Sequence, residues 1–154
     1  MKPTYDEIAK WMREYFETYN LHAQYEDTVH EMDRFFAPDL RFMPYMYLFG
    51  GPGAGHTSRE SFYAMLTGHP DDYEQFEVLD IFVDERRLVA TAFLKATVFD
   101  ANTDLPIVQK HYLPLYELTV DDNDQLKIKT IRFFWEASPP EIEEKAYSGA
   151  GKGH

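Results

Sequence analysis

Four side chains combine the residue types needed for acid–base chemistry: Tyr15, Asp80, Arg132 and Glu136. A carboxylate accepts a proton, a tyrosine donates a hydrogen bond to a developing negative charge, and an arginine stabilises an anion. Charged groups among apolar walls must be paired or have shifted pKa values, which makes them candidate acids and bases. We therefore expect these four as catalytic residues if the fold brings them together. A structural Arg–carboxylate pair is the competing interpretation.

Aromatic residues make up 16% of the chain, with 11 Tyr, 12 Phe and 2 Trp. Such an excess is typical of a pocket or a subunit interface, although a tyrosine-rich core and surface would also explain it. The residues that we expect to bind a substrate are Tyr45, His56, Tyr112, Tyr116 and Phe134.

Metal and thiol chemistry are not expected. The chain has no cysteine, and none of its six histidines pairs with another at metal-ligand spacing on one helix face. We therefore expect no metal and no cofactor. His111 has outward parity on its strand, which favours an interface role over a role as a base.

Residues 50–57 read GGPGAGHT, one residue away from the phosphate-loop pattern. His56 occupies the position of the phosphate-binding lysine, and the strands that follow are too closely spaced for a nucleotide-binding parallel sheet. The net charge of −12 also disfavours a triphosphate, a nucleic acid or an anionic membrane as a partner. A glycine loop at the rim of a pocket is the better interpretation.

Residues 74–136 must position these side chains, because they read as four strands, 74–83, 87–99, 107–120 and 125–136. The gaps are too short for crossover helices, so the strands should form an antiparallel meander. Alternation in the second strand places Ala90, Ala92, Leu94 and Ala96 on an inner face. The same parity rule places Asp80, Arg132 and Glu136 inside.

A single bulge would flip the last strand and bring Ile131, Phe133 and Trp135 inward in place of Arg132. Without the bulge, an apolar set faces outward with no helix left to cover it, which predicts a homodimer through the convex sheet face. This set comprises Phe93, Phe99, Leu113, Leu115, Ile131, Phe133 and Trp135.

Helices are expected upstream of the meander. Thr4 and Glu7 have capping-box spacing before a helix that ends near Asn20, and Thr57 and Glu60 repeat that spacing before a helix that closes at Gly68. A second helix is predicted at 27–36 and an edge strand, interrupted by Pro44, within 40–49. We expect one α+β domain at 1–140, a conical barrel of a curved antiparallel sheet enclosing N-terminal helices, and a flexible extension at 141–154.

The N-terminus lacks an apolar leader and no segment reaches the length of a membrane span, so we expect a soluble cytoplasmic protein without membrane partners. The order of elements over residues 5–137, with the strand entry APDLRF at 37–42, resembles the nuclear transport factor 2-like superfamily, whose fold is cystatin-like. The chain looks most like its SnoaL-like and ketosteroid isomerase-like members. Residues 111–118, HYLPLYEL, are also similar to a strand of the phenazine biosynthesis A/B proteins.

The resemblance implies a deep apolar pocket and usually a dimer, but each known catalytic set is incomplete here. Tyr15 matches the helix-borne oxyanion donor of the steroid isomerases, whereas Met43 stands where their general base should be. Phe133 replaces the phenazine-family glutamate, and Arg132 with Asp80 only loosely resembles the epoxide hydrolase set.

Two hypotheses remain open. In the first, the protein is a cofactor-independent enzyme that isomerises, cyclises or dehydrates a hydrophobic carbonyl compound. In the second, it is a non-catalytic small-molecule-binding or dimeric interaction module.

Overall fold

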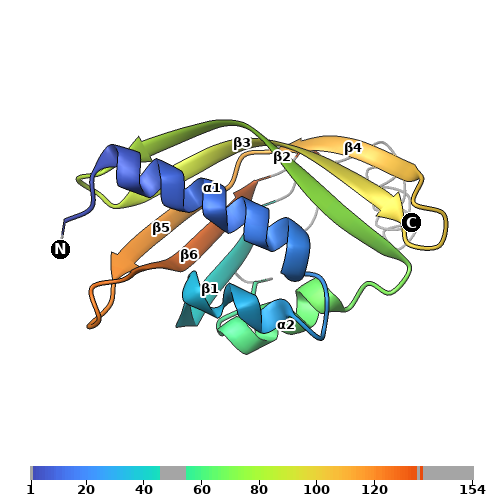
Figure 1. Cartoon of the computed structure of the whole chain (residues 1–154), viewed down its shortest axis with the longest axis horizontal. Helices are drawn as coiled ribbons and strands as arrows, with labels where there is room; N and C mark the ends of the chain where they lie inside the picture. Colours follow the sequence, from blue (N-terminus) through green and yellow to red (C-terminus); the bar gives the residue numbers. More distant parts are fainter. Residues whose placement is uncertain (1, 46–54, 135, 137–154) are drawn as a thin grey trace, which may run out of the picture.

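The computed structural model describes residues 2–45, 55–134 and 136, and Figure 1 shows their arrangement. A long helix crosses one face of a curved sheet, and two shorter helical segments lie below the helix end. The elements in chain order are α1 (Tyr5–His22), η1 (Val29–Arg34), β1 (Phe36–Tyr45), α2 (Arg59–Thr67), β2 (Asp72–Asp84), β3 (Val89–Asp100), β4 (Pro106–Tyr112), β5 (Leu115–Val120) and β6 (Leu126–Phe134). The predicted α+β fold class is confirmed.

The sheet has the strand order β1-β6-β5-β3-β2, with β4 pairing to β3 beside β5. The meander from β2 to β6 is antiparallel, as predicted, and β1 joins its end in parallel to β6. The predicted strand 107–120 is two strands, because the chain breaks at Leu113 and Pro114, where proline cannot donate to a ladder. The Thr91 hydroxyl donates to the carbonyl oxygen of Pro114 at 2.6 Å and holds this break against β3.

Helix α1 begins with the predicted capping box, since Thr4 Oγ1 accepts from the Glu7 amide at 3.2 Å. It runs to His22, slightly beyond the predicted end. Its apolar stripe faces the concave side of the sheet and consists of buried residues at helical spacing. These residues are Ile8, Met12, Tyr15, Phe16 and Tyr19.

Two amide side chains, Asn20 near the end of α1 and Gln24 just after the helix, bind the free edge of β2. Asn20 Oδ1 accepts from the Phe76 amide at 2.9 Å, and its Nδ2 donates to the Phe76 carbonyl at 2.8 Å. Gln24 does the same with Glu74, at 2.7 and 2.6 Å. A spacing of four residues along a helix covers about 6 Å and matches two residues along a strand, so both amides reach the edge. The helix thereby blocks edge-to-edge pairing of β2.

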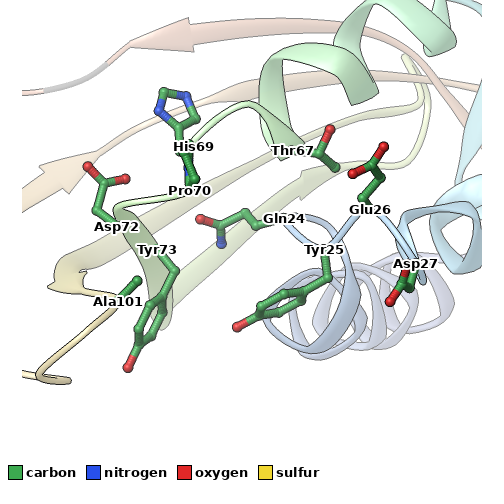
Figure 2. A pocket seen from close by; sticks show the side chains of 10 residues that line it. All are labelled: Gln24, Tyr25, Glu26, Asp27, Thr67, His69, Pro70, Asp72, Tyr73 and Ala101. Atoms are coloured by element: carbon green, nitrogen blue, oxygen red, sulfur yellow. The ribbon is translucent and has the colours of Figure 1, made fainter.

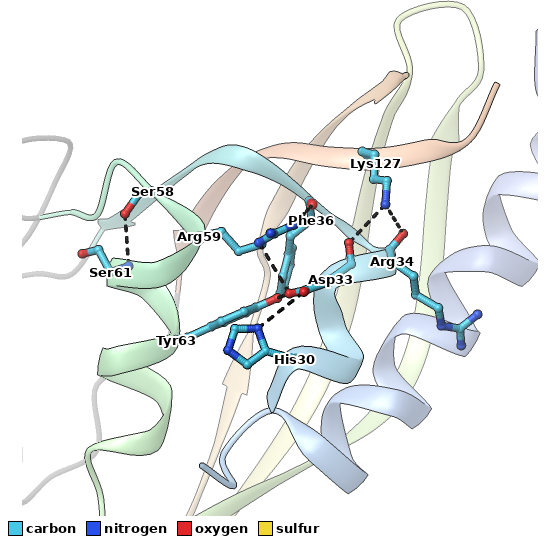
Figure 3. A network of polar contacts seen from close by, with 9 residues as sticks. All are labelled: His30, Asp33, Arg34, Phe36, Ser58, Arg59, Ser61, Tyr63 and Lys127. Carbon is cyan, nitrogen blue, oxygen red and sulfur yellow. Dashed lines mark hydrogen bonds and ion pairs between the residues drawn. The ribbon is translucent and has the colours of Figure 1, made fainter. Parts of the chain in front are cut away.

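A polar network around Asp33 joins η1 to α2 (Figure 3). The Tyr63 hydroxyl donates to Asp33 Oδ1 at 2.7 Å, and Arg59 Nε forms a longer ion pair with the same oxygen at 3.5 Å. His30 Nδ1 lies 3.4 Å from Asp33 Oδ2. Burial and the Asp33 carboxylate raise the pKa of Tyr63, so this tyrosine stays a neutral donor. Lys127 extends the network to β6 by donating to the carbonyl oxygens of Asp33 and Arg34.

Three local predictions were wrong in detail. The segment predicted as a helix at 27–36 is a short 3₁₀ helix, and β1 begins at Phe36 rather than inside 40–49. Helix α2 uses Ser58 as its N-cap, with Ser58 Oγ accepting from the Ser61 amide at 3.1 Å, so Thr57 is not the cap. The first part of the glycine loop and the C-terminal extension at 141–154 are a different case, because residues 46–54 and 137–154 lie outside the described residues.

Candidate functional site

The concave face of the sheet follows the predicted parity along β3. Ala90, Ala92, Leu94 and Ala96 have no solvent exposure. The space left by the three alanines is covered by aromatic side chains that come from α1, η1, β1 and β5. These side chains divide the concave face into two halves with different character.

The first half, which we call the packed half, comprises Tyr15, Phe16, Phe35, Phe36 and Tyr116. Each is no more than 2% exposed. The Tyr15 ring contacts the other four edge-on, with ring centroids 4.9–5.6 Å apart. Edge-to-face packing of this kind fills a core and leaves no polar surface for a ligand.

Two hydroxyl groups of the packed half bond to each other. The side chains of Tyr15 and Tyr116 share a hydrogen bond, and burial raises the pKa of both residues. Both are therefore neutral at physiological pH. The structure gives Tyr15 the hydroxyl group of Tyr116 as its partner rather than one of the predicted carboxylates.

The second half, which we call the polar half, is built around Glu74, Lys110, Tyr112 and Tyr19. The Tyr112 hydroxyl donates to Glu74 Oε2 from across β3, in a close hydrogen bond. Lys110 is 8% exposed and its Nζ lies 5.7 Å from the centroid of the Tyr112 ring. Burial, and then the charge of Glu74, raise the pKa of Tyr19. A half-buried carboxylate thus lies close to two tyrosines on the concave face, and a buried lysine lies over the ring of one of them.

Asp80 does not point into the cup, and its inward placement was wrong. A bulge between Val78 and Asp80 inserts a residue into β2, so Ile81 is buried while Asp80 and Phe82 are exposed. Asp80 Oδ1 accepts from the Ile81 amide at 2.8 Å. The carboxylate therefore lies on the convex side.

Arg132, Phe134 and Glu136 also lie outside the cup, contrary to the predicted parity. A register shift between Glu117 and Leu118 turns β6 over, so that Ile131 is buried and Phe133 packs on the core. This is the bulged alternative considered above; Trp135 lies outside the described residues. The side chain of Arg132 donates to Glu117 Oε1 and to the Tyr45 hydroxyl, both at 3.0 Å.

Glu136 is exposed and pairs with His111, whose Nδ1 lies 3.1 Å from Glu136 Oε2. Hydrogen bonds from the His111 side chain and amide lower the pKa of Glu136, so it is an anion rather than a proton acceptor poised near neutrality. Tyr45 stacks on Phe134 with ring centroids 4.5 Å apart, at the convex register. Of the five expected binding residues, Tyr112 and Tyr116 are in the cup and Tyr45 and Phe134 are not.

His56 lies beside the inner-facing residue Phe42 of β1. Its amide and carbonyl both bond to Phe42, at 2.8 Å each, and its ring centroid is 6.3 Å from that of Phe42. The Phe42 ring lies 5.6 Å from Phe133, which lies 4.8 Å from Tyr112. His56 is therefore linked through two rings to the polar half, and its predicted place near the pocket rim is consistent with this geometry.

The sequence contained a signal for Glu74 and Lys110 that the selection of candidates missed. Glu74 shares its parity with the core residue Phe76, and Lys110 shares its parity with Tyr112. A charged residue in phase with buried neighbours is the pattern that marks a perturbed group. The parity that places Asp80 and Glu136 inside holds only for strands without bulges.

An open surface cleft of about 350 Å³ adjoins the polar half (Figure 2). It lies where the end of α1, the end of α2 and the start of β2 meet, and Gln24 separates it from Glu74 by binding the Glu74 backbone. Its walls mix polar and apolar surface and include two tyrosines and three carboxylates. The lining residues are Gln24, Tyr25, Glu26, Asp27, Thr67, His69, Pro70, Asp72, Tyr73 and Ala101.

Within residues 2–45, 55–134 and 136, no group of three potential ligands is arranged to hold a metal ion. In the same part of the chain, no helix has the length and apolarity needed to cross a membrane.

Comparison with known proteins identifies the fold but no close relative. No family model matches the sequence, and no curated protein does so either. Solved structures match well. An NTF2-like protein from Anabaena variabilis superposes with a TM-score of 0.64 at 13% identity, covering 90% of this chain and 96% of the other.

Two further structures carry functional names. Nuclear transport factor 2 from Cryptosporidium parvum matches with a TM-score of 0.61 at 11% identity, over 88% of this chain and 98% of the other. An LEH-like epoxide hydrolase from M. tuberculosis matches with a TM-score of 0.57 at 14% identity, over 89% and 90%. A transport factor and an enzyme thus share this architecture, so the likeness carries the fold alone. The protein has the fold of the nuclear transport factor 2-like superfamily.

Proposed function

We propose that the protein is a cofactor-independent enzyme that performs acid–base chemistry on a hydrophobic carbonyl compound, with Glu74 as the proton acceptor. The observation that carries this proposal is the half-buried Glu74 carboxylate on the concave face, bonded by Tyr112 and close to Tyr19. A carboxylate among aromatic walls is the arrangement expected of a general base. Glu74 takes the role that the sequence suggested for Asp80 or Glu136.

The roles of the neighbouring groups follow from their chemistry. Tyr112 orients the carboxylate by hydrogen bonding, and the ammonium group of Lys110 supplies a positive charge where an enolate oxygen would develop. Phe76 and Phe133 provide apolar walls on either side of Tyr112, with centroids 5.6 and 4.8 Å from its ring. Isomerisation, cyclisation and dehydration all begin with removal of a proton next to a carbonyl group, so the site suits this reaction class.

The test uses 2-tetralone, a hydrophobic ketone with exchangeable α protons. Deuterium incorporation in D₂O, followed by NMR, should proceed faster with the protein than in buffer. Glu74→Gln should lower the protein-catalysed rate about 100-fold or more, the usual contribution of a general base. Asp80→Asn and Glu136→Gln are matched controls and should retain the rate, because both carboxylates lie outside the cup.

Equal exchange rates for the natural chain, Glu74→Gln and buffer would contradict the catalytic proposal. If 2-tetralone then still bound, the non-catalytic small-molecule-binding module would be the better description. The dense packing around Tyr15 and Tyr116 is the observation that favours this second candidate, since it leaves the predicted oxyanion donor covered.

We also propose that the protein forms a homodimer through the convex face of the sheet. Five large apolar side chains on that side are 40–51% exposed: Leu79, Phe82, Phe93, Leu113 and Phe134. Strand pairing places Phe82 opposite Thr91, where β2 pairs with β3, and Phe134 opposite Tyr45, where β6 pairs with β1. The exposed apolar side chains of the convex face therefore come from strands near both edges of the sheet. Exposed apolar patches of this kind are typical of subunit contacts.

Ile131 and Phe133, which were expected on this surface, belong to the core. Light scattering should give twice the mass of 18.1 kDa for the natural chain. Phe93→Asp should give the monomer mass, whereas Leu21→Asp, at an exposed apolar residue of α1, should leave the dimer intact. A monomer for the natural chain would refute the dimer.

A further inference from the structure

Outside the polar half, one side-chain pair has the composition of a nucleophile and its base. His56 Nδ1 lies 2.5 Å from Ser61 Oγ, and both residues are half-buried. With the proton on Nε2, Nδ1 accepts the hydrogen bond from the hydroxyl group. A serine hydroxyl is a weak nucleophile unless an adjacent base removes its proton, and a direct hydrogen bond between hydroxyl and imidazole is the arrangement found in such pairs.

The fold fixes the histidine from its backbone. Gly55 approaches β1 so closely that a Cβ atom there would lie 1.9 Å from the Phe42 carbonyl oxygen, so a side chain at this position would prevent the contact. This approach allows His56 to form its two backbone hydrogen bonds to Phe42. The imidazole therefore projects from a short bridge paired to the sheet rather than from a free loop.

The serine lies in the first turn of α2. Its amide is satisfied by Ser58 Oγ, and the amide of Phe62 donates to the Ser58 carbonyl, so the cap leaves the hydroxyl group of Ser61 for His56. Side chains in a helix lean toward its N-terminus. At that end, backbone amides of the first turn have no intrahelical acceptor, and the helix dipole favours negative charge. An oxyanion that forms on a group attached to Ser61 would lie near these amides.

Apolar rings flank the pair. Phe42, which holds His56, stacks on Phe62, the residue after Ser61, with centroids 4.7 Å apart and planes 27° apart. Phe42 also faces Phe133, which lines the polar half. Phe42 and Phe62 are themselves buried, and Phe133 is the half-exposed ring of this cluster, so a hydrophobic acyl or aryl group is the substrate that would fit beside it.

We propose that Ser61 is an acyl-accepting nucleophile activated by His56, and that its substrate class is hydrophobic carboxylic esters. Ser61 Oγ forms a bond to the ester carbonyl carbon while its proton moves to His56 Nδ1. The ester C–O bond breaks and the leaving alcohol receives that proton. Water then attacks the acyl-enzyme, releases the carboxylic acid and restores the serine.

This reaction uses groups on the β1–α2 side of the cup and does not involve Glu74. The two proposals therefore fail separately. Glu74→Gln should abolish ketone exchange and leave the reactivity of Ser61 unchanged, whereas Ser61→Ala should do the reverse.

The experiment is labelling of the full chain with an alkyl fluorophosphonate, which forms a P–O bond to an activated serine and releases fluoride. Peptide mass spectrometry should place the adduct on Ser61. Ser61→Ala should lose the label, and His56→Gln should slow labelling about 100-fold, the effect of removing a general base. Thr57→Ala removes an exposed hydroxyl group from the same segment and should label at the natural rate.

Turnover of p-nitrophenyl butyrate should show the same order among the variants. No adduct on the natural chain, an adduct on another residue, or equal labelling of the natural chain and His56→Gln would each overturn the proposal. The residue that carries the adduct in the natural chain tests whether Ser61 is the nucleophile even if a variant fails to fold.

Discussion

The two halves of the concave face share helix α1 but use different strands, β1 and β5 in the packed half and β2 and β4 in the polar half, and they differ in what they bury. The packed half holds five aromatic residues with almost no exposure, and its two hydroxyl groups bond to each other. The polar half holds a carboxylate and a lysine, and Glu74 and Phe133 remain half-exposed. Polar groups on a concave apolar surface are costly to bury, and on this face they are concentrated in the polar half.

The two halves also hold the helix differently. The packed half anchors α1 and β1 through ring contacts centred on Tyr15. In the polar half, Tyr19 of α1 stacks on Phe76 with ring centroids 4.8 Å apart, and hydrogen bonds from Asn20 and Gln24 to the edge of β2 add to this packing. The end of α1 is therefore held by both apolar and polar contacts.

The largest difference between the halves should appear on truncation of a ring. Phe16→Ala in the packed half should lower the free energy of unfolding by about 3–5 kcal/mol, because it leaves a cavity in a closed core. Phe133→Ala in the polar half should cost less than half of that, since Phe133 is already half-exposed. Urea titrations followed by circular dichroism measure both. Equal losses would show that the two halves are packed alike.

Alkaline pH should act mainly through the buried tyrosines. Burial raises the pKa values of Tyr15, Tyr19 and Tyr116, whereas an unfolded tyrosine has a pKa of about 10. Above pH 10 the unfolded chain loses these protons and the folded chain keeps them, so the stability that is complete below pH 10 falls as the pH rises. Three such groups give a slope of about 4 kcal/mol per pH unit.

Absorbance at 295 nm, recorded with far-ultraviolet circular dichroism, should show these three tyrosines ionising together with unfolding. Ionisation of all tyrosines near pH 10 in a chain that stays folded would show that the packed half is open to solvent.

A smaller effect is expected at the edge of β2. Gln24→Ala removes both partners of the Glu74 backbone and should lower the free energy of unfolding by about 1–3 kcal/mol. It should also speed amide hydrogen exchange at Glu74. Gln109→Ala, which removes an exposed side-chain contact to Thr97, is the matched control and should stay within 0.5 kcal/mol of the natural chain, about the range of surface substitutions.

The sequence predicted the fold well because its signals are periodic. Three periodic or local patterns predicted a helix packed against an antiparallel sheet. They are the capping box of α1, the short turns of the meander, and the alternation of Ala90, Ala92, Leu94 and Ala96. Pro114 is a local signal for the break between β4 and β5, which the prediction of a single strand at 107–120 did not include.

The site was harder to predict because parity fails at a bulge. One extra residue near Asp80 and one register shift near Glu117 reversed the facing of two strand ends, and three of the four expected catalytic residues lie at or beyond them. Such bulges and register shifts follow from sheet curvature rather than from local composition. No sequence pattern around Asp80 or Arg132 therefore predicts them. Glu74 precedes the first bulge, and its parity held.

The most direct test of the division is a methyl NMR titration of the protein with 2-tetralone. Val98 and Val108 are paired inner residues of the polar half, whereas Ile8 and Ile128 belong to the core beside the packed half. We predict that the ligand shifts the methyl signals of Val98 and Val108 and leaves those of Ile8 and Ile128 unchanged. Shifts confined to Ile8 and Ile128, or to Leu79 and Leu113 on the convex face, would contradict the assignment of the polar half as the functional site.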